Sequence, residues 1–85
     1  MELKELRLKI DEIDTKLVQL FIDRLDIAVK VAEYKKENEL PVYDPIREQE
    51  VLDKISSKVS EKRKEAITEI YKLIFKLSKE VQENL

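Results

Sequence analysis

The sequence of 85 residues contains no glycine, cysteine, histidine or tryptophan. Without cysteine and histidine the chain has no thiolate nucleophile, no imidazole base, no disulfide framework and no zinc-finger site. Without glycine it has neither a P-loop nor a dinucleotide fingerprint, because both need backbone positions that only glycine tolerates beside a phosphate. These absences exclude most familiar catalytic machinery, and we expect no metal and no cofactor.

Charge is abundant but balanced, with 17 lysine and arginine residues against 19 aspartate and glutamate residues. A nucleic-acid-binding protein would be expected to carry an excess of positive charge that forms a basic face, and this chain has no such excess. The start, MELKELRLK, carries charges every second or third residue, unlike a signal peptide. No run approaches the roughly 20 apolar residues of a membrane-spanning helix. We therefore expect a soluble, cytoplasmic protein that binds neither nucleic acid nor membrane.

The first half of the chain has the apolar pattern of one long helix. Apolar residues recur at alternating steps of three and four, which fits a helix and no strand. The pattern runs from Leu3 to Asn38, and Pro41 disfavours helical geometry at the residue before it. At helical rise this segment would be about 54 Å long, which exceeds the diameter of a small domain.

Two shorter helices are predicted after the long one. Asp44 is suited to N-capping and Pro45 to the first helical position, so a second helix begins there and runs to about Ser57. A short break follows, with Ser60 as a candidate cap for a third helix of about 22 residues. No segment resembles a strand. The expected fold class is all-α, with three helices in a single domain over residues 1–85.

The helix lengths indicate an oligomer. The second and third helices together are only about as long as the first, so within one chain they cover only one side of it. A second copy of the chain, packed on the long helix, best explains the part of its apolar stripe that the shorter helices leave uncovered. A chain this short is also near the lower size limit for a self-sufficient hydrophobic core. At this point a simple coiled-coil or bundle protein without chemistry is as good an interpretation as an enzyme.

One cation interrupts the apolar stripe of the long helix. Ile10, Leu17 and Val31 share a heptad position whose fourth member is Arg24. A cation there is costly unless an anion meets it, and a salt bridge across the bundle is the plainer interpretation. The chain uses thirteen lysines and only four arginines. The choice of arginine at position 24 therefore indicates a need for its planar guanidinium, which binds carboxylates in bidentate fashion.

Helix geometry separates the cations into two groups. Eleven steps from Arg24 to Lys35 return to within about 20° of the same face, so Arg24, Val31 and Lys35 line one wall. Arg7 lies about 26 Å earlier along the axis, too far to share a small ligand with Arg24 of its own chain. It could contribute only to a different site, such as one in a partner chain.

The third helix also carries polar residues in an apolar row, formed by Tyr71, Phe75, Ser78 and Gln82. Taken singly, the serine can bond to its own helix backbone and the glutamine can be exposed. Together with the inward cations, they indicate a polar pocket between helices, where helical bundles usually bind ligands.

The order of these residues closely resembles the all-α class of chorismate mutases. The resemblance is carried by the opening LRLKIDEIDTKLVQLFIDR, by Lys35, by the Asp-Pro-Ile-Arg-Glu element at residues 44–48, and by Ser78 and Gln82. It covers essentially the whole chain. Ala32 stands where many relatives have glycine, and Lys79 where the family often has an apolar residue.

The resemblance implies an intertwined homodimer with two equivalent sites that convert chorismate, a dianion, to prephenate in phenylalanine and tyrosine biosynthesis. It implies that Arg7 crosses to the partner's site. Arg7 and Arg24, assisted by Ser78, would hold the carboxylates.

The remaining implied contacts involve the second and third helices. By the same resemblance Lys35 and Gln82 would bond to the ether oxygen, and Glu48 would accept from the ring hydroxyl, helped by backbone near Asp44. Arg47 would support the pocket. The apolar walls would be Val31, Val51 and Phe75.

A pericyclic rearrangement suits the composition, since it needs no proton transfer and no covalent intermediate. Two alternatives stay open. One is an isochorismate pyruvate lyase on the same scaffold, and the other is a non-catalytic helical module for dimerisation or regulation.

Overall fold

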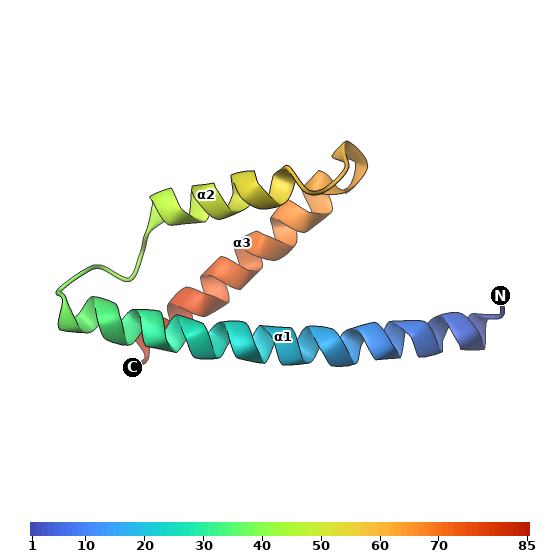
Figure 1. Ribbon diagram of the computed structural model, residues 1–85, viewed down its shortest axis with the longest axis horizontal. Coiled ribbons are helices and arrows are strands. Elements are labelled where there is room, and N and C mark those ends of the chain that lie inside the picture. Colours follow the sequence, from blue (N-terminus) through green and yellow to red (C-terminus); the bar gives the residue numbers. More distant parts are fainter.

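The computed structural model describes residues 1–85 as three helices without a strand (Figure 1). Helix α1 spans Leu3–Glu37, α2 spans Pro45–Ser56 and α3 spans Glu61–Glu83. The all-α class is confirmed. Asn38 and Ser57, expected as the last residues of their helices, are the C-caps that follow them.

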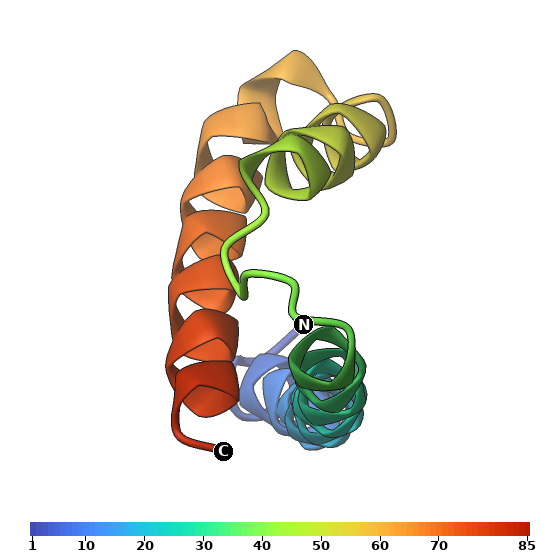
Figure 2. The same ribbon diagram turned by 90° about the vertical axis from the view of Figure 1, so that its left-hand side faces the viewer.

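Helix α3 is the helix on which both of the others pack. It packs against both α1 and α2, whereas α1 and α2 do not pack directly on each other. Figures 1 and 2 show α3 crossing the carboxyl-terminal half of α1, with α2 held away from α1 on the far end of α3. Residues of all three helices line a pocket between them.

Helix α1 ends before Pro41 through a backbone motif. The N–H of Glu39 bonds to the carbonyl of Lys36 at 3.3 Å, and the N–H of Leu40 to that of Lys35 at 2.7 Å. This is a Schellman motif, which needs a left-handed residue after the C-cap. Glu39 fills that position with φ 54, where glycine is usual.

The two candidate capping residues behave differently. The Asp44 side chain accepts a hydrogen bond of 3.0 Å from the backbone N–H of Arg47, with Pro45 in the first turn, as the sequence predicts. Ser60 occupies the N-cap position of α3, but its side chain makes no capping hydrogen bond. Its carbonyl accepts from the N–H of Arg63 instead.

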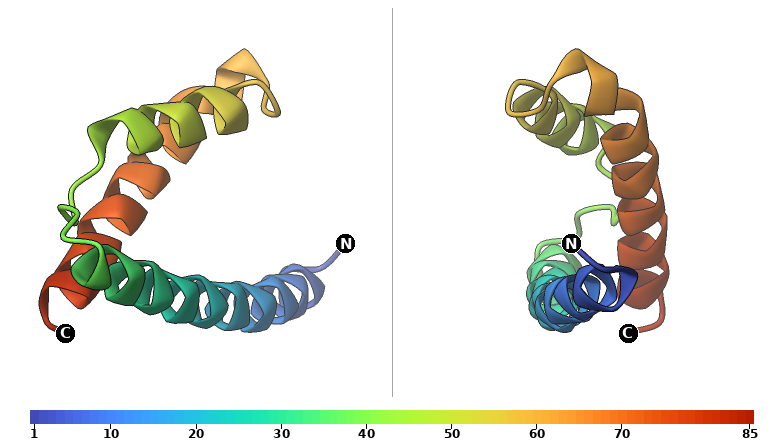
Figure 3. Two further views of the ribbon diagram at one scale, coloured as in Figure 1. Left: turned by 60° about the vertical axis from the view of Figure 1, so that its left-hand side comes forward. Right: turned by 90° about the vertical axis from the view of Figure 1, so that its right-hand side faces the viewer.

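The single chain buries little. Only Ala28, Ala32, Phe75 and Ser78 are buried, and the radius of gyration is 16.0 Å where a compact domain of this length has about 12 Å. The amino-terminal half of α1 extends beyond α3 with no helix packed on it (Figure 3). Its apolar side chains are exposed, Ile10 and Ile13 by 55% each. No helix is both long enough and apolar enough to cross a membrane.

Candidate active site

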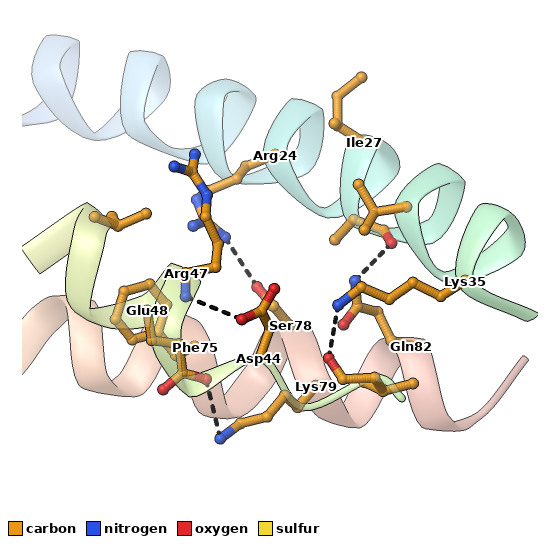
Figure 4. Close-up of a pocket in the computed structure, with 14 residues that line it drawn as sticks. Arg24, Ile27, Lys35, Asp44, Arg47, Glu48, Phe75, Ser78, Lys79 and Gln82 are labelled. Carbon is orange, nitrogen blue, oxygen red and sulfur yellow. Dashed lines mark hydrogen bonds and ion pairs between the residues drawn. The ribbon is translucent and has the colours of Figure 1, made fainter. Parts of the chain in front are cut away.

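A pocket of about 320 Å³ lies between the carboxyl-terminal half of α1, the first turns of α2 and the carboxyl-terminal half of α3 (Figure 4). Its volume is within the range of small-molecule sites, and it is partly open to solvent. The capped start of α2 fixes one wall, and the packing of α3 on α1 fixes the other.

The fold brings ten of the residues proposed from the sequence into this one pocket. They are Arg24, Val31, Lys35, Asp44, Arg47, Glu48, Val51, Phe75, Ser78 and Gln82. Arg7 does not line it. The roles of these residues toward a substrate stay predictions.

Arg24 reaches the pocket from α1 and is held from α3. Its Nη1 donates a hydrogen bond of 3.0 Å to the hydroxyl of Ser78, and its guanidinium lies 6.0 Å from the ring centroid of Phe75. Phe75 and Ser78 are both buried. No carboxylate of the chain forms an ion pair with Arg24, so its charge is oriented but not neutralised.

Lys35 and Gln82 are both anchored to backbone carbonyls. The Lys35 ammonium donates to Val42 at 2.9 Å, and the Gln82 amide donates to Ala28 at 2.9 Å. An ammonium has three donors and an amide nitrogen two, so each group keeps at least one donor for a ligand. In Figure 4 both side chains lie at the same end of the pocket.

Glu48 projects from α2 and lies at the end of the pocket opposite Lys35 and Gln82 (Figure 4). Its carboxylate lies 3.3 Å from the ammonium of Lys79 on α3. The neighbouring acid, Asp44, is engaged as the cap of α2. Glu48 is therefore the carboxylate available to accept a hydrogen bond from a ligand hydroxyl.

The pocket is electropositive. Its lining includes the cations of Arg24, Lys35, Arg47 and Lys79 against two carboxylates, which leaves a net charge of two positive. Low-dielectric walls focus such a field and raise the local concentration of anions. The arrangement can bind and orient a small dianion.

Four lining residues were not assigned to the pocket from the sequence: Ile27, Ala28, Val42 and Lys79. The first two lie one turn from Arg24 and Val31, so helical spacing alone places them there. Val42 is in the 38–44 linker, where no periodicity applies. Tyr71 shares the α3 row but is outside the pocket, where it packs edge-on against Phe75 with ring centroids 6.0 Å apart.

Solved structures include one of very similar architecture, a chorismate mutase from Helicobacter pylori in complex with prephenate. The two chains share 41% sequence identity with a TM-score of 0.88, over 96% of this chain and 90% of the other. The likeness extends to all three helices.

Curated relatives match over shorter stretches. A chorismate mutase of Methanocaldococcus jannaschii is 44% identical over 54 residues, which are 64% of this chain and 54% of that protein. A bifunctional chorismate mutase/prephenate dehydratase of Aquifex aeolicus is 43% identical over 54 residues, 64% of this chain and 15% of that protein. The matched stretch is thus about half of one relative and a small part of the other.

The family model described as chorismate mutase type II matches residues 6–83. This match includes every pocket residue as well as Arg7, and it agrees with the three-helix fold and the electropositive pocket. The chain belongs to the chorismate mutase type II family.

Proposed function

We propose that this chain is an isomerase that converts chorismate to prephenate. The observation that carries the proposal is the dianion-sized pocket with a net charge of two positive and two anchored donors, Lys35 and Gln82, at one end. In this rearrangement the ether C–O bond breaks as a C–C bond forms, and no proton moves. A pocket without histidine or cysteine is sufficient for such chemistry.

The proposed roles are those that the family resemblance implies, and the contacts that hold each donor support them. Arg24, oriented by Ser78, binds a substrate carboxylate. Lys35 and Gln82 bond to the ether oxygen, on which negative charge grows in the transition state. Because their anchoring bonds to backbone are already made, little reorganisation is needed, and a donor of this kind is typically worth a factor of about a hundred or more in rate.

Glu48 and the apolar walls supply orientation. The Glu48 carboxylate accepts from the ring hydroxyl, while Val31, Val51 and Phe75 enclose the ring. Arg47 adds positive charge at the rim, where its guanidinium lies 3.4 Å from Glu50. Holding a flexible substrate in its compact reactive conformer removes entropy from the barrier before the reaction begins.

We further propose that the active form is an intertwined homodimer. The isolated chain exposes 7268 Å², whereas a compact protein of this mass exposes about 5,300 Å². The excess of roughly 2,000 Å² per chain suits an obligate dimer interface. The exposed apolar stripe of α1 is the surface to be covered, and pairing along it would bring Arg7 to the partner's pocket. Such an enzyme would serve phenylalanine and tyrosine biosynthesis in the cytoplasm.

The test is to follow the absorbance of chorismate with purified protein and to identify the product. The proposal predicts prephenate as the product. Absence of turnover, or a protein that instead releases pyruvate from isochorismate and leaves salicylate, would contradict it. The variant Lys72→Met, at an exposed position of α3 outside the pocket, controls for activity lost during purification.

A further inference from the structure

Lys79 forms the one ion pair of the chain that joins two different helices. Its ammonium lies 3.3 Å from a carboxylate oxygen of Glu48, and the side chains are 31% and 26% exposed. The three other ion pairs each link residues three apart on one helix. Partial burial and the crossing between α3 and α2 distinguish this pair from ordinary surface pairs, which contribute little.

The same ammonium has a second partner. It lies 4.4 Å from the ring centroid of Tyr43, a distance typical of a cation–π contact. Tyr43 directly follows Val42, whose carbonyl anchors Lys35, and directly precedes Asp44, the cap of α2. Lys79 on α3 therefore contacts both α2, through the ion pair with Glu48, and the 38–44 linker, through the ring of Tyr43.

Glu48 needs such a partner because of its surroundings. The pocket that it faces contains the cations of Arg24 and Lys35, to which a free carboxylate would be attracted. A Glu48 side chain turned toward either cation would occupy the charge that a dianionic ligand requires. Pairing with Lys79 instead holds the carboxylate at the α2–α3 wall (Figure 4).

We propose that Lys79 is a positioning residue that fixes the Glu48 carboxylate for the ligand hydroxyl and keeps it away from Arg24 and Lys35. Lys79 acts through Glu48 and does not itself touch the reacting atoms. This inference rests on the proposed chorismate mutase function.

The first test is a double-mutant cycle on the homodimeric enzyme with chorismate as substrate. Lys79→Met keeps the apolar stem and removes the charge, and it is expected to raise KM about tenfold with a smaller change in kcat. In a Glu48→Gln background the same substitution is expected to change KM by less than about twofold, because the partner is already uncharged. Lys79→Arg restores the charge and should recover KM to within about threefold of the wild type.

Lys72→Met is the matched control, since Lys72 lies on the same helix and pairs with Glu69 away from the pocket. It should leave KM and kcat unchanged. A wild-type KM in Lys79→Met would overturn the inference. So would an undiminished effect of Lys79→Met in the Glu48→Gln background, which would mean that Lys79 acts on the substrate independently.

A ligand-free measurement separates this inference from the proposed function. The NMR signal of the Glu48 side-chain carboxyl carbon should shift in Lys79→Met and not in Lys72→Met, whether or not the protein turns over chorismate. An unchanged signal would refute the positioning role even in an active enzyme. A shifted signal in an inactive protein would support the pairing of Lys79 with Glu48 and would refute only the proposed chorismate mutase activity.

Discussion

The guanidinium of Arg24 on α1 donates a hydrogen bond of 3.0 Å to the hydroxyl of Ser78 on α3, across 54 positions of sequence. The bond positions a cation inside an apolar stripe without neutralising it. Within the chain, the salt bridge that would have been the plainer explanation for this arginine is absent. The charge is left for an anion that the chain itself does not supply.

Arg24→Ala is therefore expected to lower kcat/KM by about a hundredfold or more, since it removes a preorganised donor. Ser78→Ala should cost less, about three- to tenfold, because it removes only the bond that orients the guanidinium. Steady-state kinetics measure both effects, and circular dichroism should show unchanged helicity. Equal activity of Arg24→Ala and wild type would contradict the assignment.

Lys35→Ala should likewise reduce kcat by about a hundredfold or more. It removes both the proposed donor to the ether oxygen and the bond to the Val42 carbonyl that holds the linker. The matched control is Lys36→Ala, because Lys36 points about 100° away from Lys35 and does not line the pocket. A Lys36 variant impaired as severely as the Lys35 variant would show that the loss is not specific to the site.

A charge in the apolar stripe of α1 should break the proposed dimer. Ile13→Lys is expected to give monomers, measured by analytical ultracentrifugation, with reduced helicity and no turnover, because a monomer has too little core. Gln19→Lys introduces the same residue on the other face of α1 and should stay dimeric and active. A fully active monomeric Ile13→Lys protein would refute the two-chain site.

Glu39→Gly should stabilise the protein by about 0.5–1 kcal/mol per chain. The left-handed conformation at φ 54 costs a side-chain-bearing residue about 1–2 kcal/mol, and part of this gain is offset by the greater chain entropy of glycine when unfolded. Chemical denaturation at fixed protein concentration measures the change. A decrease in stability would contradict the assignment of a conformational cost to the left-handed backbone of Glu39.

The helices and the α1 and α3 walls of the pocket could be predicted from the sequence because both depend on helical periodicity. The α2 residues Arg47, Glu48 and Val51 were instead expected from the resemblance to chorismate mutases. The eleven-residue spacing of Arg24 and Lys35 places them on one face, and the Asp44-Pro45 pair marks the start of α2. The ends of α1 and α2 agree with expectation to within one residue.

The parts that could not be predicted depend on tertiary position. Val42 enters the pocket because the linker folds back toward Lys35, and no local pattern encodes that path. Lys79 follows Ser78 on a helix, so only the actual rotation of α3 decides that its ammonium meets Glu48 and Tyr43. The absence of a side-chain capping bond at Ser60 is likewise not encoded in the local pattern, since the residue occupies the expected N-cap position.

In the proposed dimer, fixed charges from two chains form each active site, and mixed dimers test this arrangement most directly. Arg7→Ala and Arg24→Ala variants, each inactive alone, are co-expressed or refolded together. If Arg7 crosses to the partner, a mixed dimer contains one site with both arginines intact, so random mixing should restore about a quarter of the wild-type activity per chain. No recovery above the separate variants, in a mixture shown to contain mixed dimers, would contradict the shared site.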